Sequence, residues 1–382
     1  MGISTHSFSA SVSVIANDET WIESSAVQQL EKTAQLKGIT QAAGMPDLHP
    51  GRGYPIGASF LSNSTIYPAL VGNDIGCGMS LWQTDLKSRK LNLDKLEKRL
   101  TGLDHPLDHS WANLLSEEQA LRNLTPTAFD RSLGTIGGGN HFAELQQLDD
   151  IYAKNTCDEL ELKKDRLVLL VHSGSRGLGE RILRDHVDQF SHQGLSVESP
   201  AFDTYLQRHD QALCFAELNR KLIALRMLDA LNTDGKPLLD VNHNLVEYID
   251  CPDASGWIHR KGATPADRGL VMIPGSRGDY SYLVQPKPDV KSLYSLAHGA
   301  GRKWKRNECK GRLDKRYQVQ DLERTVFGGR VICKDKALIF EEAPEAYKRI
   351  DSVISAMLDA NLIELIARFK PVLTYKTQGG CC

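Results

Sequence analysis

The feature that most constrains the fold is a set of apolar runs that end abruptly in polar, glycine-rich segments. The clearest is 167–171, where five consecutive apolar residues predict a strand buried on both faces. It ends at His172, and a Gly/Ser/Arg segment then leads toward a predicted helix, a geometry that suits phosphate binding at the helix N-terminus. Two shorter strands that also run into polar ends are predicted at 238–241 and 271–273.

Periodicity and capping residues predict the remaining elements. Ser24 or Ser25 is the expected cap of the first helix, and the segment dense in Gly and Pro over 44–57 predicts a long functional loop. No repeat period and no Pro/Ser-rich linker is found, so we expect one compact α+β domain over residues 1–382. Helices are predicted at 24–37, 91–100, 112–124, 180–190, 204–231 and 345–368.

A carboxylate and a thiol lie three residues apart in the turn from Gly72 to Gly78. Glycine permits positive φ and close backbone approach, so this turn could present Asp74 and Cys77 at one point. Both groups bind divalent metals, and a thiolate can bridge two ions. Taken alone, however, the segment fits a tight turn around a buried structural cysteine better.

A second polar segment follows three glycines at 137–139. Those glycines free backbone N–H groups to face an anion, and Asn140, His141 and Glu144 come directly after them. A histidine in this position could be a buried core residue, but the adjacent polar side chains favour a site.

Five potential metal ligands stand far apart in the sequence, which is typical of a preformed site held by the fold rather than of a zinc finger. One carboxylate, one thiolate and three imidazoles suffice for two ions if the thiolate bridges them. Ligand softness alone favours zinc over Mn²⁺. Two-metal sites promote phosphoryl transfer, so these residues predict a metal-dependent enzyme acting on phosphate esters. The five are Asp74, Cys77, His141, His172 and His243.

Composition excludes several classes of protein. The 382 residues are 41% hydrophobic and 25% charged, as in a globular protein. No apolar run reaches the length of a membrane span, and the N-terminus lacks a secretory pattern, so no membrane association is expected. The eight cysteines show no framework spacing, which predicts free thiols in the cytoplasm.

The net charge is −2, so affinity for nucleic acid would have to come from a local patch. Residues 302–316 hold eight Lys or Arg, with Glu308 and Asp314 as the acids, and Trp304 and Tyr317 are available for stacking. This segment is either a solvated helix face or a surface for a phosphate backbone, and its closeness to the polar segments favours the second.

Seven ordered motifs make the sequence resemble the RtcB family of RNA-splicing ligases. They span residues 45 to 302, and Lys376 extends the match toward the C-terminus. The motifs are Met45–His49, Asp74–Gly78, Gly137–Phe142, His172–Gly177, Arg260–Thr264, Pro274–Ser276 and His298–Arg302.

The resemblance implies an RtcB-like fold, in which mixed sheets flanked by helices surround a central metal and nucleotide cleft. It implies a ligase, dependent on GTP and two Mn²⁺ ions, that joins RNA ends with a 2′,3′-cyclic phosphate or 3′-phosphate to 5′-hydroxyl ends. His298 would attack GTP and form a guanylyl-histidine. Asp74, Cys77 and His141 would hold one ion, and Cys77, His172 and His243 the other.

The resemblance also implies a nucleotide site in which Lys376 contacts the guanine. Asp47, Arg176, Arg260, Lys261 and Arg302 would support the site or bind RNA. The residues implied to bind the nucleotide are Asn140, His141, Phe142, Ala143, Glu144, His243, Asn244, Pro274, Gly275, Ser276, Arg277, Ser281, His298, Gly299, Ala300, Gly301 and Lys376.

The sequence departs from the family pattern at a few positions. Arg277 stands where most members have Met, Lys305-Arg306 where Ser-Arg is usual, and Asn242 where Ala is usual. These features are similar to the branch associated with a release-factor-like protein, which implies repair of cleaved RNA, with ribosomal RNA as a candidate, rather than routine tRNA splicing.

Two other classes of protein share some of these features. A metal-dependent phosphodiesterase or cyclic phosphatase would use the same ions without an adduct on His298. A non-enzymatic RNA-binding protein on the same fold would not need Cys77 beyond stability.

Overall fold

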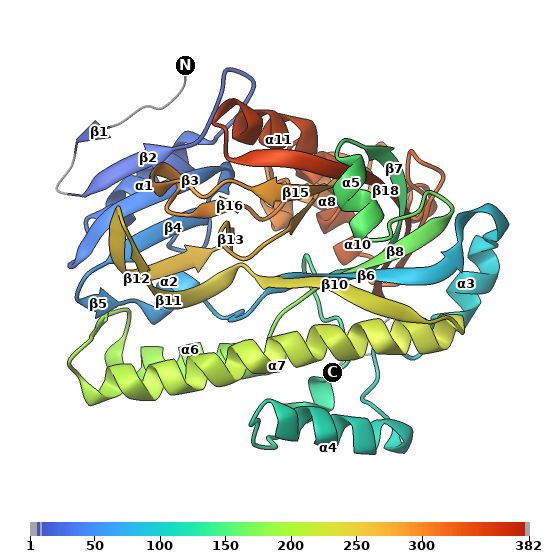
Figure 1. Ribbon diagram of the computed structural model, residues 1–382, viewed down its shortest axis with the longest axis horizontal. Helices are drawn as coiled ribbons and strands as arrows, with labels where there is room; N and C mark the ends of the chain where they lie inside the picture. The colour runs from blue at the N-terminus through green and yellow to red at the C-terminus, as the bar shows by residue number, and fades with distance from the viewer. Residues whose placement is uncertain (1–5, 8–9, 379–382) are drawn as a thin grey trace.

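The computed structural model describes residues 6–7 and 10–378, whose strands form two large sheets (Figure 1). The six-stranded sheet has the order β1 (His6–Ser7), β2 (Ser11–Val14), β3 (Ile39–His49), β4 (Ile56–Ser62), β12 (Ala254–Lys261), β11 (Asn244–Cys251). The eight-stranded sheet has the order β10 (Gly235–Asn242), β6 (Gly78–Lys87), β8 (Arg166–Ser173), β7 (Phe142–Ile151), β18 (Ile363–Thr377), β15 (Ser281–Pro286), β14 (Val271–Pro274), with β17 (Arg330–Cys333) pairing with β18. Two small sheets pair β13 (Ala263–Pro265) with β16 (Ser295–Ala297), and β5 (Thr65–Ile66) with β9 (Leu195–Ser196).

Helices cover both sheets. The α-helices are α1 (Ser24–Ala34), α2 (Pro68–Val71), α3 (Leu93–Arg99), α4 (Ala112–Leu121), α5 (Lys154–Glu159), α6 (Gly177–Phe190), α7 (Pro200–Leu231), α8 (Arg306–Leu313), α9 (Val319–Leu322), α10 (Leu338–Glu341) and α11 (Ile350–Asp359). The predicted α+β class is confirmed. None of the helices in the described part of the chain is long and apolar enough to cross a membrane.

Strand β8 is buried on both faces, as its continuous apolar run predicted. Leu167, Leu169 and Val171 pack into the core that contains the C-terminal half of α7, whereas Val168 and Leu170 pack into the core on the opposite face. Figure 1 shows α7 running along this sheet beside β6 and β10. The alternation follows from the two-residue period of a strand.

The six-stranded sheet also separates two cores. Leu30 of α1 packs with Phe60 on one face. Leu61 and Ile258 pack on the other face with residues of α11, including Val353. The cores on both sides fix the position of β3, which carries Asp47.

The ends of four strands bring the predicted ligands together. Antiparallel pairing places Gly78, at the start of β6, opposite both Ser173 at the end of β8 and Asn242 at the end of β10. His172 lies opposite Phe142, the first residue of β7. Segments that precede β6 and β7 therefore meet segments that end β8 and β10 at one edge of the sheet.

His243 lies between the two large sheets, because β10 belongs to one and β11 to the other. On the second sheet, Asn244 pairs with Lys261 at the end of β12. The chain thus passes through His243 directly from the end of β10 in the eight-stranded sheet to the start of β11 in the six-stranded sheet. The site forms where the two sheets meet.

Two expectations near the N-terminus are wrong. The segment 44–57 is not one loop, because β3 continues to His49 and β4 starts at Ile56. The pairing register shifts between Gly44 and His49, so the glycine and proline there mark an irregular strand rather than its absence. Helix α1 is preceded by Glu23, which makes no side-chain cap, so Ser24 and Ser25 are not caps.

The helix predicted over 345–368 is also wrong in its second half. Helix α11 stops at Asp359, because Asn361 takes a left-handed conformation and Leu362 donates its N–H to Met357 O, which closes the helix. The following residues form the long strand β18. Register irregularities in β18 interrupt its two-residue period, so its pattern resembled a helix.

Candidate active site and metal centre

Two groups of three side chains converge at the edge of the eight-stranded sheet. Cys77, His172 and His243 form one, and Asp74, Cys77 and His141 form the other, with the ligand atoms of each group within 4.8 Å of one another. The Cys77 Sγ lies 3.4 Å from His141 Nε2 and 3.2 Å from His172 Nε2. Cys77 belongs to both groups, as a bridging thiolate would.

Backbone carbonyls orient two of the imidazoles. His141 Nδ1 lies 3.1 Å from Ile136 O, and His172 Nδ1 lies 3.2 Å from Asn140 O. A carbonyl only accepts, so each Nδ1 carries a proton and each ring turns its Nε2 inward. His141 Nε2 then faces Asp74 Oδ2 at 2.8 Å.

Lone pairs that face a carboxylate and a thiol repel one another unless a proton or a cation lies between them. A divalent cation between them would accept all of these lone pairs. Histidines that ligate a metal usually donate their other ring N–H to a carbonyl or a carboxylate, as His141 and His172 do here. The donor set therefore fits metal ions.

Electrostatics also favour a cation here. Burial opposes ionisation of Asp74, but the nearby His141 and its hydrogen bond outweigh that effect and hold the pKa of Asp74 at about 2. Burial, together with Asp74, raises the pKa of the Cys77 thiol well above its usual value. Burial lowers the pKa values of His172 and His243, so both rings are neutral. A bound cation would lower the pKa of the Cys77 thiol, because it stabilises the thiolate.

His298 follows β16 and lies beside the candidate metal ligands. Its ring centroid is 4.8 Å from that of His243. Its Nδ1 lies 2.6 Å from Oδ2 of the fully buried Asp47, although the geometry between the two groups falls outside that of a hydrogen bond. A Cβ on Gly262 would lie 2.9 Å from the His298 ring, so glycine is needed for the ring to fit.

A cavity of about 610 Å³ opens over these residues. It is lined by Asp74, Cys77, His141, His243 and His298, so the metal groups and the His298 ring share one space. Four cations also line it: Arg131, Arg176, Lys261 and Arg306. Burial lowers the pKa of Lys261 to about 8, and Asp74 opposes that shift. The volume of this cavity and the cations that line it suit a phosphorylated ligand.

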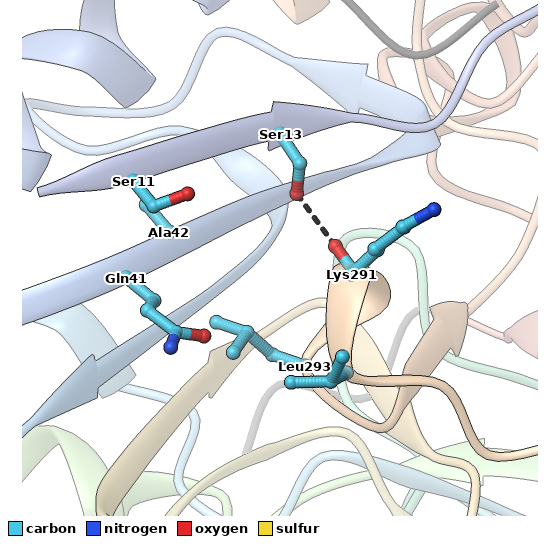
Figure 2. A pocket seen from close by; sticks show the side chains of 7 residues that line it. Ser11, Ser13, Gln41, Ala42, Lys291 and Leu293 are labelled. Atoms are coloured by element: carbon cyan, nitrogen blue, oxygen red, sulfur yellow. Dashed lines mark hydrogen bonds between the residues drawn. The ribbon is translucent and has the colours of Figure 1, made fainter. Parts of the chain in front are cut away.

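A second cavity, of about 320 Å³, lies elsewhere (Figure 2). It is bordered by β2, β3 and residues 290–293, where Ser13 Oγ donates to Lys291 O at 2.5 Å. Its lining residues include no histidine, cysteine or carboxylate. Groups that could bind a metal ion line the first cavity instead.

The family described as tRNA-splicing ligase RtcB matches residues 29–123 and 112–377 of this chain. The chain belongs to the RtcB family. It is similar to the RNA-splicing ligase RtcB2 of Escherichia coli, at 55% identity over 100% of this chain and 99% of the relative. It is similar at 32% to RtcB1 of the same strain, over 93% and 95%, and at 30% to the tRNA-splicing ligase RtcB of Nanoarchaeum equitans, over 94% and 92%.

As an RtcB-family RNA ligase, the protein has an RNA substrate. The residues that the resemblance implies for nucleotide binding fall into connected groups. Asn140 and Asn244 line the cavity. Deeper, Gln146 donates to Glu144 Oε1 at 2.6 Å and to Ser281 Oγ at 2.8 Å. Lys376 Nζ donates to Gly139 O at 2.7 Å.

The remaining positions are near these groups. Ala143 and Phe142 begin β7, and Phe142 packs against the His172 ring. Pro274 ends β14 and accepts the Ala300 N–H at its carbonyl, which joins Pro274–Ser276 to the His298–Gly301 loop.

Three expected RNA or nucleotide cations of this RtcB protein point into the protein instead. Arg277 donates to the carbonyl oxygens of residues 322, 339 and 342. Arg260 contacts Glu247 and Ser295. Arg302 contacts Glu342 and Tyr347. Their side chains therefore support the fold around the site.

The sequence did not reveal several residues that hold the site. Arg220 on α7 is fully buried and donates to Gly76 O at 2.6 Å and Ser173 O at 3.0 Å, next to two metal-ligand positions. Glu342 is buried among cations and lies 3.6 Å from Lys376 Nζ. Neither the arginine on a predicted helix nor the glutamate gave a signal for this, because the burial of a polar residue is not visible in the sequence.

The basic segment 302–316 includes α8. Arg306 begins the helix and lines the cavity, and Lys310, Lys315 and Arg316 are exposed beyond it. The aromatic residues are not free for stacking: Trp304 is covered by Arg312 and Lys303, and Tyr317 by Arg316.

Proposed function

We propose that this RtcB-family protein joins an RNA 3′-phosphate end to a 5′-hydroxyl end through a guanylyl-histidine on His298, with GTP as the source of the guanylyl group. The observation that carries the proposal is the placement of His298 between Asp47 and the ligand groups at the floor of the cavity. Asp47 faces Nδ1, which directs the Nε2 lone pair of the neutral ring away from the carboxylate, as a nucleophile requires.

The first step forms a bond between His298 Nε2 and the α-phosphorus of GTP and releases pyrophosphate. An oxygen of the RNA 3′-phosphate then attacks that phosphorus, which breaks the N–P bond and frees the imidazole. The RNA 5′-hydroxyl attacks the activated 3′-phosphate and expels GMP. An end that carries a 2′,3′-cyclic phosphate needs hydrolysis to a 3′-phosphate before this sequence.

Two Mn²⁺ ions are proposed for the two ligand groups, Asp74, Cys77 and His141 for one and Cys77, His172 and His243 for the other. When bound, such ions supply electrophilic activation and charge neutralisation of phosphate oxygens. The cations Arg176 and Lys261 in the cavity would bind phosphates directly.

The guanine is proposed to lie between Lys376 and Glu144, with Ser281 nearby. Glu144 and Ser281 share Gln146 as a hydrogen-bond donor, and Lys376 is buried next to Glu342. Asn140, Asn244 and the backbone of Ser276 and Gly299–Gly301 would hold the ribose and phosphates.

Exposed cations on α8 and directly after it are proposed to bind the backbone of the RNA. They continue from Arg306 at the cavity, so a strand that enters the site would pass over them. Electrostatic contacts of this kind carry no sequence preference.

We propose repair of cleaved RNA, with ribosomal RNA as a candidate substrate, as the role of the protein in the cytoplasm, together with a release-factor-like protein. The support is the set of departures from the family pattern at Asn242, Arg277 and Lys305-Arg306, which resemble the branch associated with such a protein. Ligation of nicked ribosomes should exceed ligation of nicked tRNA at equal concentration. Equal or faster joining of tRNA would remove the support for this role.

The central test is transfer of label from GTP radiolabelled at the α-phosphate, in the presence of Mn²⁺. The wild-type protein should acquire acid-labile label, and His298→Ala should not. A folded wild-type protein that acquires no label but opens 2′,3′-cyclic phosphates would instead be the phosphodiesterase alternative.

A further inference from the structure

Strand β3 contains an irregular stretch, residues 45–48, that has no register partner in either neighbouring strand. Pairing with β2 ends at Gly44, and pairing with β4 resumes at His49. The carbonyl groups of this buried stretch therefore need other donors, because an unpaired buried carbonyl destabilises the fold. Asp47, which faces His298, lies in this stretch.

The donors are two side chains, those of Lys348 and His49. The ammonium of Lys348 donates to Pro46 O at 3.0 Å and to Leu48 O at 2.8 Å. The His49 Nδ1 lies 2.9 Å from Asp47 O. Three consecutive carbonyl oxygens are thus satisfied, and the two that flank Asp47 are both held by one side chain.

The backbone of Lys348 holds the loop that follows His298. Lys348 N–H donates to Gly301 O at 3.0 Å, three residues beyond His298. Gly301 has φ +67°, and a Cβ there would collide with the Asp47 carbonyl. The loop that carries His298 and the strand that carries Asp47 therefore touch, and Lys348 is bonded to both.

A charged lysine in this position is costly, and its surroundings reflect that. Lys348 is only 7% exposed. Burial lowers its pKa to about 8, which the carboxylate of Asp47 opposes. The Trp21 ring lies 5.9 Å from its ammonium. Both Asp47 oxygens are buried without another hydrogen-bond partner, so the orientation of this carboxylate depends on how its backbone is held.

We propose that Lys348 is a positioning residue that sets the approach of Asp47 to His298 by holding the backbone on both sides of Asp47 and the loop that follows His298. This inference rests on the proposed guanylylation of His298. It assigns to the segment around Lys348 a part in the first chemical step, although its side chain does not line the cavity.

The test is a double-mutant cycle on the single-turnover rate of guanylylation at saturating GTP. Lys348→Met should slow this rate about ten- to a hundredfold, because a displacement of about 1 Å at reacting groups has that effect. Asp47→Asn should slow it as well. If Lys348 acts through Asp47, Lys348→Met should have little further effect in the Asp47→Asn background. The dissociation constant of GTP should stay close to that of the wild type.

The control separates this effect from loss of stability. Thr84 donates to Leu167 O within the eight-stranded sheet, at the far end of β6 from Cys77. Thr84→Val should lower the melting temperature but leave the guanylylation rate of the folded protein unchanged. If Lys348→Met does not fold, Lys348→Gln, which keeps N–H donors but lacks charge and reach, is measured in the same cycle.

Equal slowing by the Lys348 variant in both backgrounds would overturn the inference, as would no slowing in a folded variant. Failure of the proposed function is distinguishable, since wild-type protein would then acquire no label at all. Recovery of the rate by Lys348→Arg, which can also donate to two carbonyls, would support the inference.

Discussion

Arg220 of α7 donates a hydrogen bond of 2.6 Å to the carbonyl oxygen of Gly76, the residue before Cys77. The same guanidinium reaches Ser173, directly after His172, and pairs with Asp240 on β10. One buried side chain thus joins three of the segments that carry the candidate metal-ligand positions.

Arg220→Met is therefore expected to lower the free energy of unfolding by about 3–5 kcal/mol, because it leaves buried partners unpaired. It should also weaken Mn²⁺ binding about 10–100-fold, the usual effect of losing support for a ligand. Denaturant unfolding and metal titration measure the two effects. Lys221, the next residue on the helix, pairs with Glu118. The control variant Lys221→Met should therefore leave metal binding intact. Unchanged affinity in folded Arg220→Met would show that α7 does not position the ligands.

Cys77→Ser should remove most of the stabilisation by Mn²⁺. A metal that binds only the folded state stabilises it by about 2.7 kcal/mol at a concentration a hundred times its dissociation constant. Metal binding requires the thiolate, whose pKa is raised by burial, so the affinity of the wild type should fall as the pH is lowered. Melting curves with and without Mn²⁺ test this. Cys214→Ser, at a half-buried position on α7, should keep the full metal-dependent shift.

Binding of GTP should weaken as the pH falls below about 7. Burial raises the pKa of Glu144 to about 7, although Thr374, Gln146 and Lys376 oppose the shift. If the ionised carboxylate accepts hydrogen bonds from guanine, the competent fraction falls about tenfold per unit below that pKa. Glu144→Gln should bind GTP more weakly at pH 8 and show a flatter profile. Calorimetric titration between pH 6 and 8 measures this, and parallel profiles for both proteins would contradict it.

Acid should destabilise the fold through His259. Burial lowers the pKa of His259 to about 4, and its Nε2 accepts the Tyr67 N–H, so the folded protein holds this ring neutral. The unfolded chain takes up the proton near pH 6.5. The stabilisation is therefore complete above pH 6.5 and is lost as the pH falls toward 4, by about 3 kcal/mol in total.

His259→Gln keeps an acceptor for the Tyr67 N–H but does not titrate. Its free energy of unfolding should change less than that of the wild type between pH 7 and 5. Guanidinium unfolding at the two pH values gives the comparison. Because every other titratable group is the same in both proteins, the difference between them isolates His259.

Neutralising the exposed cations on α8 and directly after it should weaken RNA binding and reduce its dependence on salt. Each phosphate contact to a single strand contributes about 0.7 to the slope of log affinity against log salt concentration. The triple change Lys310→Gln, Lys315→Gln, Arg316→Gln should lower that slope while guanylylation without RNA stays unchanged. Lys236→Gln, at the far end of β10, is the control. An unaltered slope would mean that RNA does not pass over α8.

Much of the core could be predicted because it depends on local pattern. The run over 167–171 shows a doubly buried strand, and the long amphipathic segment over 204–231 corresponds to most of α7. The predictions of secondary structure were wrong where tertiary contacts replace regular pairing between strands. Residues 45–48 of β3 depend on Lys348, about three hundred positions away, and β18 is irregular in register. Neither effect leaves a period in the sequence.

The sequence by itself determined which side chains are available, because carboxylate, thiol and imidazole groups next to glycines have few common uses, and their ordered motifs indicate the family. Only the tertiary structure decided which of the cations face the cavity and which, such as Arg277 and Arg260, are directed at carbonyl or carboxylate oxygens inside the protein. The reason is that direction and burial of a side chain come from how strands distant in sequence pair and pack, and the identity of the residue is the same in both cases.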